Sequence, residues 1–233
     1  MSGSQDFVRM RQRAVEALID EGIIKHANVI AAMMKVPREE FLPSTARTHA
    51  YVDAPISIGF GQTTSALHMT AMFCEYGEMR LGQSVLEVGG GCGYMSAVYA
   101  EIVASTEEPK NRWGHVWSAE IIPELAETGK KNIERLGFSE RVTFECRDAS
   151  GGYEGETRFD AIIVTSAAPS IPTDLTNQLN VDGTLIIPIG EPQIYQELHK
   201  IRRKVDGTFS HETLGGVAFV PMRGKYGWQK IIR

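Results

Sequence analysis

The sequence predicts an α/β fold with a doubly wound, mostly parallel sheet and a helical extension at the N-terminus. From residue 84 onward, short apolar runs alternate with helical patterns, and a glycine-rich loop directly follows the first run. Strands that alternate with helices imply crossover connections and therefore a parallel sheet. Ligands of such sheets bind beyond the carboxyl ends of the strands, so site residues are expected just after each strand.

The N-terminal part is expected to begin with two helices, over residues 6–22 and 28–36, with Asn28 as the cap of the second. Residues 36–55 contain three prolines and should form an irregular, extended segment over the main domain. A glycine-rich turn then leads into a helix over about residues 67–79.

The sheet core is expected to start at residue 84. Its expected strands are 84–88, 115–120, 141–148, 159–165 and 183–190, and amphipathic helices are expected at 94–103 and 123–137. We expect residues 1–83 to supply the N-terminal helices and a segment that covers the site. Residues 84–233 should form the sheet core, and the two parts together make one compact domain.

Composition and charge exclude several classes of protein. The formal net charge of −5 argues against a general nucleic-acid binder, and the basic run HKIRRK (199–204) is expected to be a solvated strand face. No run approaches the roughly 20 apolar residues of a membrane helix, and the N-terminus lacks the apolar centre of a signal peptide. Three scattered cysteines suggest neither a disulfide framework nor a zinc site. We therefore expect a cytoplasmic protein that binds no metal, membrane or nucleic acid.

The loop VLEVGGGCGY (85–94) favours a ligand without phosphate. Tyr94 stands where a dinucleotide fingerprint has its third glycine, and the G-K-[ST] ending of a P-loop is absent. Glu87 would repel a phosphate but would favour a cation such as S-adenosylmethionine, and glycines let the backbone approach it. The loop glycines are Gly89, Gly90, Gly91 and Gly93. They could instead serve only a tight turn from strand to helix.

Acidic residues also end the next two expected strands. Glu120 ends the second strand, where a carboxylate can accept hydrogen bonds from both ribose hydroxyls of a nucleoside. Asp148 ends the third strand and, with Ala149, could meet an adenine ring. Each acid alone could be an exposed cap or turn residue. Three acids in register with one glycine loop favour a cofactor site.

Several motifs together resemble the protein-L-isoaspartate O-methyltransferases, a family of S-adenosylmethionine-dependent class I methyltransferases. They are VPREEFLP, AYVDAP, IGFGQTTSALHM (58–69), the glycine loop, FDAIIVTSAAPSIP (159–172), LNVDGTLIIPIG (179–190) and FVPMRGKYGW (219–228). The resemblance implies a seven-stranded sheet whose last strands are ordered differently from those of other class I methyltransferases. It also implies methylation of the free α-carboxylate of L-isoaspartyl residues in damaged proteins and peptides, which starts their repair through a succinimide.

The resemblance assigns the expected site residues. Ser65 matches the catalytic serine of the family, and we interpret it as orienting the substrate carboxylate; its alternative role is a helix N-cap. Besides Ser65, the expected cofactor-binding residues are Gln62, Thr63, Thr64, His68, Glu87, Gly89, Gly90, Gly91, Gly93, Tyr94, Glu120, Ile121, Asp148, Ala149 and Thr165. The expected substrate-binding residues are Ile58, Gln196, Val220, Pro221 and Arg223. No His–Asp or Cys–His arrangement is evident, and an ionised carboxylate needs no general base.

The chain departs from the family pattern at two places. Gly90 and Cys92 replace small hydroxyl residues of the loop, which is expected to alter cofactor affinity, and Arg223 replaces a smaller residue. Three alternatives stay open: a related carboxyl methyltransferase with one dedicated partner, a non-catalytic S-adenosylmethionine-binding protein, and an NAD-dependent dehydrogenase. Family members are commonly monomeric, and a monomer is expected.

Overall fold

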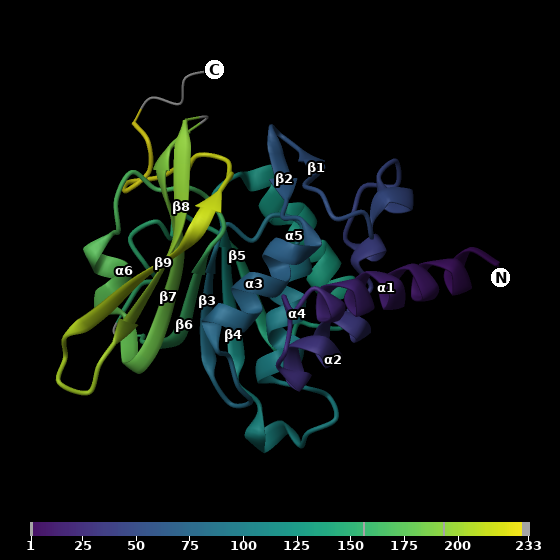
Figure 1. Ribbon diagram of the computed structural model, residues 1–233, viewed down its shortest axis with the longest axis horizontal. Helices are drawn as coiled ribbons and strands as arrows, with labels where there is room; N and C mark the ends of the chain where they lie inside the picture. The colour runs from purple at the N-terminus through teal and green to yellow at the C-terminus, as the bar shows by residue number, and fades with distance from the viewer. Residues whose placement is uncertain (1, 156, 193, 230–233) are drawn as a thin grey trace.

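The computed structural model describes residues 2–155, 157–192 and 194–229 and has a seven-stranded sheet at its centre (Figure 1). The strand order is β5-β4-β3-β6-β7-β8-β9. The first five strands in this order are parallel, whereas β8 and β9 are antiparallel to their neighbours. The predicted fold class is thereby confirmed. The strands are β3 (Ser84–Val88), β4 (His115–Glu120), β5 (Val142–Cys146), β6 (Phe159–Val164), β7 (Leu179–Glu191), β8 (Tyr195–Arg203) and β9 (Phe209–Val217).

Two features of the β7–β9 edge differ from the sequence prediction. Strand β7 starts at Leu179, four residues before the predicted start at 183, because Leu179 already pairs with Phe159 of β6. The basic run lies largely in β8, but it is not simply a solvated face. Lys200 and Arg202 form ion pairs with Glu78 at 2.5 and 3.0 Å, so an acid outside the sheet partly neutralises the run.

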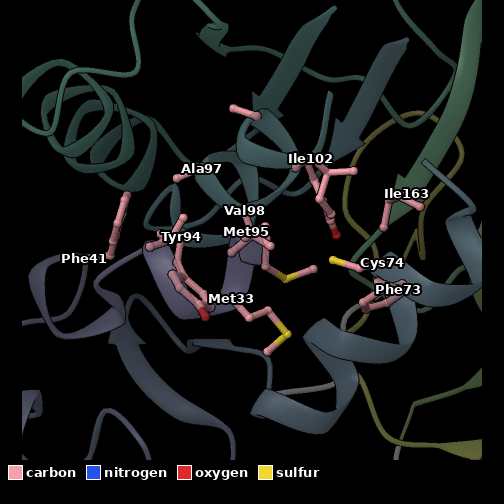
Figure 2. Packing of buried hydrophobic residues seen from close by; sticks show 14 of the residues in the cluster. Met33, Phe41, Phe73, Cys74, Tyr94, Met95, Ala97, Val98, Ile102 and Ile163 are labelled. Carbon is pink, nitrogen blue, oxygen red and sulfur yellow. The ribbon is translucent and has the colours of Figure 1, made fainter. Parts of the chain in front are cut away.

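Helices cover one face of the sheet almost completely. Helix α4 packs on β3, β4 and β5, and all ten of its residues are buried, because α2 covers its outer side. This helix was expected to be amphipathic, but it has no solvent-facing side. In Figure 2, Met95 and Val98 of α4 lie between Met33 of α2 and Cys74 of α3. The helices are α1 (Ser2–Asp20), α2 (Ala27–Lys35), α3 (Leu67–Gly77), α4 (Tyr94–Val103), α5 (Pro123–Arg135) and α6 (Thr173–Asn177).

The predicted helix cap Asn28 is wrong, and Ser65 does not take its alternative role as a cap. The N-cap of α2 is His26, and Asn28 lies inside the helix, where its amide donates to the Met79 carbonyl at 2.9 Å. The N-cap of α3 is Ala66, so the Ser65 hydroxyl does not cap this helix. For both α2 and α3, the helix therefore starts at a residue that the capping preferences of the local sequence do not indicate.

The irregular segment 36–55 contains two short 3-10 helices, η1 (Arg38–Glu40) and η2 (Arg47–His49). Arg38 is fully buried, and its guanidinium donates to the Ser65 carbonyl at 2.7 Å and lies 4.9 Å from the Tyr94 ring centre. The segment is therefore anchored beside the chain that leads into α3. A hairpin of β1 (Ile56–Gly59) and β2 (Gln62–Thr64) follows it.

The other face of the sheet carries a smaller apolar cluster, covered by α6 and by loops that include Tyr153 and Met222. Among the described residues, no helix combines the length and apolar character required to cross a membrane.

Candidate active site

The candidate site lies where the strand order reverses. The chain runs from β3 outward to β5 and then returns to β6, on the other side of β3. Such a switch point opens a crevice beyond the strand ends. We call this crevice the strand-end cavity. Its lining residues are Ile58, Gln62, Thr63, Val88, Gly89, Gly91, Ala119, Glu120, Ile121, Ile122, Arg147, Asp148, Ala149, Ser150, Thr165, Ser166, Val220, Pro221, Met222 and Arg223.

Two further cavities adjoin it. The inner cavity lies between the glycine loop and the end of β2, and the Ser65 cleft lies between the start of α3 and the start of β8. Thr63 and Thr165 line all three, and Ser65 lines both of the latter. The inner cavity is lined by Ile58, Thr63, Thr64, Ser65, Glu87, Gly89, Gly90, Gly91, Cys92, Tyr94, Met95 and Thr165. The Ser65 cleft is lined by Pro55, Thr63, Ser65, Ala66, His68, Met69, Thr165, Ile194, Tyr195, Gln196, Gly216, Val217, Ala218, Phe219 and Val220.

The glycine loop is held by side chains from two neighbouring strands. Gly89 has φ +99°, and a Cβ there would lie 2.3 Å from the Thr165 hydroxyl, which donates to the Gly89 carbonyl at 2.7 Å. The Gly91 N–H donates to Glu120 at 2.9 Å. Gly93, expected to bind the cofactor, is the N-cap of α4 and lines none of the three cavities, and a Cβ on it would lie 3.2 Å from the Gly129 carbonyl oxygen of α5. Because Gly93 has no side chain, the end of the glycine loop can pack closely against α5.

Close packing explains why residue 90 is glycine in this chain. A Cβ on Gly90 would lie 2.3 Å from the Ser118 hydroxyl oxygen and 2.7 Å from the Phe144 ring. Ser118 of β4 therefore occupies the space that a side chain at residue 90 would need. The departure from the family pattern at Gly90 is therefore matched by the position of Ser118 in the neighbouring strand β4.

We expect Gly90→Ala to destabilise the fold, because the added methyl must displace Ser118 and Phe144. Overpacking of this kind costs about 1–3 kcal/mol, which corresponds to a drop of roughly 2–12 °C in the melting temperature of a chain this long. Thermal unfolding followed by circular dichroism measures it. Gly216→Ala is the matched control, since the nearest atom to its Cβ would be 3.9 Å away. Equal melting temperatures for both variants would contradict the packing argument.

Glu87 is a fully buried carboxyl group beside the inner cavity. Its Oε2 accepts hydrogen bonds from the hydroxyls of Ser118, at 2.6 Å, and Ser96. Its Oε1 has no hydrogen-bond partner among the described residues. Burial raises the pKa of Glu87 to about 7, although the two serines partly oppose this shift. An unpartnered buried carboxyl oxygen suits a cationic or hydrogen-donating ligand group.

Glu120 ends β4 as predicted, whereas Asp148, predicted to end the next strand, lies two residues beyond the end of β5, and both already accept backbone hydrogen bonds. Glu120 receives the N–H groups of Gly91 and Ile122, each at 2.9 Å, one on each carboxylate oxygen. Asp148 receives the N–H groups of Ser150 and Lys225 at 2.9 and 2.7 Å. Partial burial alone would raise the pKa of Asp148, but these N–H donors more than offset it, so the pKa lies below its usual value. Each carboxylate oxygen keeps further acceptor capacity.

The Ser65 cleft contains a histidine–aspartate pair that the sequence did not reveal. His68 Nδ1 lies 2.9 Å from the Asp53 carboxylate, which also accepts the His68 backbone N–H at 2.9 Å. His68 lines this cleft, whereas the glycine loop lines the other two cavities. No such pair was evident in the sequence, because the partners are 15 residues apart on different elements.

The C-terminal segment closes one side of the site. The Ala167 N–H donates to the Val220 carbonyl and the Met222 N–H donates to the Ala167 carbonyl, both at 2.8 Å, and Trp228 also donates to Ala167. On this side of the predicted substrate-binding edge, the Val220 carbonyl and the Met222 N–H are thus already hydrogen-bonded within the chain. Arg223 lines the strand-end cavity.

Gln196 joins the C-terminal segment to β8. It is 4% exposed, and its amide exchanges two hydrogen bonds with the Phe219 backbone, at 2.6 and 3.0 Å. Its amide is therefore used mainly to hold residue 219 against the Ser65 cleft.

Sequence reasoning missed Arg147, which lines the strand-end cavity and stacks 4.1 Å from the Tyr153 ring centre. Its position directly before Asp148 was the available signal. Among the described residues, no group of three or more histidine, cysteine or acidic side chains is arranged to hold a metal.

Solved structures identify the class of protein first. A Plasmodium falciparum protein described as a protein-L-isoaspartate O-methyltransferase, solved in complex with S-adenosyl-L-homocysteine, is 27% identical with a TM-score of 0.78, covering 90% of this chain and 96% of that chain. A second solved protein-L-isoaspartate O-methyltransferase is 29% identical with a TM-score of 0.80, covering 93% of this chain and 67% of that one. The fold is that of an S-adenosylmethionine-dependent methyltransferase, and S-adenosylmethionine is the cofactor of this class.

The family follows from the sequence comparisons. The model of the protein-L-isoaspartate(D-aspartate) O-methyltransferase (PCMT) family matches residues 9–227. The Hyperthermus butylicus protein-L-isoaspartate O-methyltransferase is 46% identical over 224 residues, covering 96% of this chain and 92% of the relative. The corresponding Pyrococcus horikoshii protein is 41% identical over 230 residues, covering 99% and 100%. The chain belongs to this family, which confirms the resemblance stated above.

Proposed function

We propose that this enzyme transfers a methyl group from S-adenosylmethionine to the free α-carboxylate of L-isoaspartyl residues in proteins and peptides. The methyl ester then loses methanol to a succinimide, which starts the return to normal aspartate. Membership of the family over nearly the whole chain supports the activity. One geometric observation carries the assignment of the site: Thr63 and Thr165 line both the cavity around the glycine loop and the cleft that contains Ser65.

The residues around the strand-end and inner cavities fit S-adenosylmethionine. Glu87, Glu120 and Asp148 present carboxyl groups there, and Glu87 keeps an unpartnered oxygen. When bound, the cofactor supplies a methyl group on a positively charged sulfur. Glu120 would hold the ribose hydroxyls, Asp148 and Ala149 the adenine, and the backbone near Glu87 the cationic amino-acid part.

Ser65 would orient the substrate on the other side. The substrate carboxylate, with an ordinary pKa near ~4, is already ionised at neutral pH, so the enzyme needs no base to activate it. What remains is to hold the carboxylate in line and to exclude water, and positioning can contribute about 7–11 kcal/mol. Arg38 fixes the Ser65 backbone through its carbonyl, so that the hydroxyl can donate to a bound carboxylate. His68, paired with Asp53, lies in the same cleft and would help to define its shape.

The direct test is transfer of labelled methyl from S-adenosylmethionine to an L-isoaspartyl hexapeptide, with the matched aspartyl peptide as control. We expect methylation of the isoaspartyl peptide alone. Equal labelling of both peptides would contradict the specificity. S-adenosylmethionine binding without transfer to either peptide would favour an enzyme with one dedicated partner.

We expect the stability of the ligand-free protein to depend on Glu87 and pH. Because the pKa of Glu87 is raised to about 7, only the unfolded chain is ionised at this group between its ordinary pKa and pH 7. The free energy of unfolding should therefore fall by roughly 3 kcal/mol as the pH rises from about 4.5 to about 7.5. In urea titrations, Glu87→Gln, a neutral mimic of the protonated carboxyl, should lose this fall, so the two proteins differ more at pH 8 than at pH 5. Parallel pH curves would contradict the raised pKa.

We further infer that the enzyme works as a cytoplasmic monomer without nucleic-acid or membrane partners, and that residues 1–83 and 84–233 fold as one unit. The net charge of −5 and three free cysteines support this inference. So does an apolar cluster shared by Val15 of α1 and Val98 of α4. Size-exclusion chromatography with light scattering tests the oligomeric state.

A further inference from the structure

Three large apolar residues are exposed near the cavities of the candidate site. Ile194 and Tyr195, which line the Ser65 cleft, are 76% and 62% exposed, and Phe60, at the tip of the β1–β2 hairpin, is 54% exposed. Figure 1 shows that the hairpin and the upper end of β8 project from the same end of the molecule. We call Phe60, Ile194 and Tyr195 the apolar rim.

The backbone at Phe60 is unfavourable for a phenylalanine. Gly59 pairs with Gln62 across the hairpin, so Phe60 and Gly61 form a two-residue turn, with φ angles of +54° and +70°. A two-residue turn with positive φ at both positions favours Asn-Gly, because asparagine tolerates the left-handed region and aromatic residues do not. Local turn preference therefore does not explain phenylalanine at this position.

Packing within the chain does not explain it either. Phe60 is more exposed than buried, and it is absent from the residues that pack against the two apolar clusters of the described chain. Its neighbours Ile58 and Gln62, two residues away on either side, line the strand-end cavity. An exposed aromatic residue with a strained backbone, beside a binding cavity, is expected to contact a bound molecule rather than other residues of its own chain.

We propose that the apolar rim binds the side chains that flank the isoaspartyl residue of the substrate, so that the enzyme prefers damaged sites with large apolar neighbours. The proposal rests on the proposed function and names the substrate class of the same site. The occupant is an extended, locally unfolded segment of the damaged protein. Its isoaspartyl carboxylate would reach Ser65, and neighbouring residues would pass Ile194 and Tyr195 on one side and Phe60 on the other.

Continuity with the cleft supports this occupant. The residues that line the cleft together with Ile194 and Tyr195 include Met69, Val217 and Ala218, so an apolar side chain next to the isoaspartyl residue has apolar surface to contact inside the cleft as well. Large apolar side chains are typically buried in folded proteins. A preference for them selects isoaspartyl residues in segments that have lost their native packing.

The test compares two L-isoaspartyl hexapeptides, one with leucine and phenylalanine flanks and one with serine and glycine flanks. The wild-type enzyme should show a KM about 10-fold lower for the apolar-flanked peptide, at similar kcat, because contacts made equally in the ground and transition states change KM alone. Phe60→Asn and an Ile194→Ser/Tyr195→Ser double variant should each remove much of this difference. For Phe60→Asn, at a residue that lines none of the three cavities, the KM for the serine-flanked peptide and the affinity for S-adenosylmethionine should stay within about 2-fold of wild type.

Two controls separate binding from folding. Because asparagine suits the turn, Phe60→Asn should melt no lower than wild type, whereas a structural role for Phe60 predicts a lower melting temperature. Phe209→Ser removes another exposed aromatic residue, 42% exposed, at the far end of β9, where it pairs with Arg203. This variant should keep the wild-type preference for apolar flanks.

Equal wild-type KM values for the two peptides would overturn the proposal while leaving the methyltransferase function intact. So would a Phe60→Asn variant that raises both KM values equally or that melts lower with an unchanged preference. If the wild-type enzyme binds S-adenosylmethionine and methylates neither peptide, the proposed function fails, and the proposal fails with it.

Discussion

Ser65→Ala is expected to lower kcat for an isoaspartyl peptide about 100-fold and to change the affinity for S-adenosylmethionine by less than about 3-fold. Ser65 lines both the Ser65 cleft and the inner cavity, and its carbonyl is already bound by Arg38, which leaves the hydroxyl available to a substrate. Losing one donor to the substrate carboxylate leaves the nucleophile poorly aligned. The fold and the acids around the glycine loop are left in place.

Steady-state kinetics and isothermal titration calorimetry measure the two quantities separately. Ser57→Ala is the matched control, because Ser57 lies exposed on the adjacent strand β1 and lines none of the three cavities described above. Its kcat should equal that of wild type. A Ser65→Ala variant with unchanged kcat, or with kcat and cofactor affinity reduced in parallel, would contradict the role of Ser65 as a substrate orienter.

Glu120→Ala should weaken S-adenosylmethionine binding about 100-fold, because a carboxylate can form two charge-assisted hydrogen bonds with ribose hydroxyls at roughly 1.5–3 kcal/mol each. The same change removes the acceptor of the Gly91 and Ile122 N–H groups. The ligand-free protein should therefore also lose about 1–3 kcal/mol of stability. At saturating cofactor, kcat should fall far less than in Ser65→Ala.

Titration calorimetry with S-adenosyl-L-homocysteine gives the affinity without turnover. Glu120→Gln keeps one carbonyl acceptor, so its affinity should lie between those of wild type and Glu120→Ala. Glu124→Ala is the control, since Glu124 is exposed on the first turn of α5. If Glu120→Ala binds the ligand as tightly as Glu124→Ala does, Glu120 does not bind the ribose.

The central strands and the glycine loop could be predicted because the sequence patterns that indicate them are local. Strands β3 and β4 and helix α4 have the predicted bounds, since short apolar runs between turn residues leave few alternatives. Glu120 and Asp148 lie beside the glycine loop as predicted, because parallel strands place their carboxyl ends at one edge.

Contacts between distant segments could not be predicted in this way. The Asp53–His68 pair, the Asp148 bond to Lys225 and the Ser118 contact at Gly90 each join residues from different elements. The prediction of Asn28 as a helix cap is wrong for the same reason: its side-chain amide donates a hydrogen bond to the Met79 carbonyl and does not cap its own helix. No spacing in the sequence encodes these contacts, because they depend on how packed layers meet.

By itself, the sequence determined the alternation of strands and helices, the glycine loop with its acids, and, through its motifs, the family. These are properties of residue order, which hydrophobic periodicity and turn chemistry express directly. Only the tertiary structure decided that Ser65 lies between two cavities and that Glu87 is buried with a raised pKa. It also decided that Phe60 stands strained and exposed. Burial, electrostatic environment and exposure are set by neighbours far apart in the chain, and they exist only once the chain has folded.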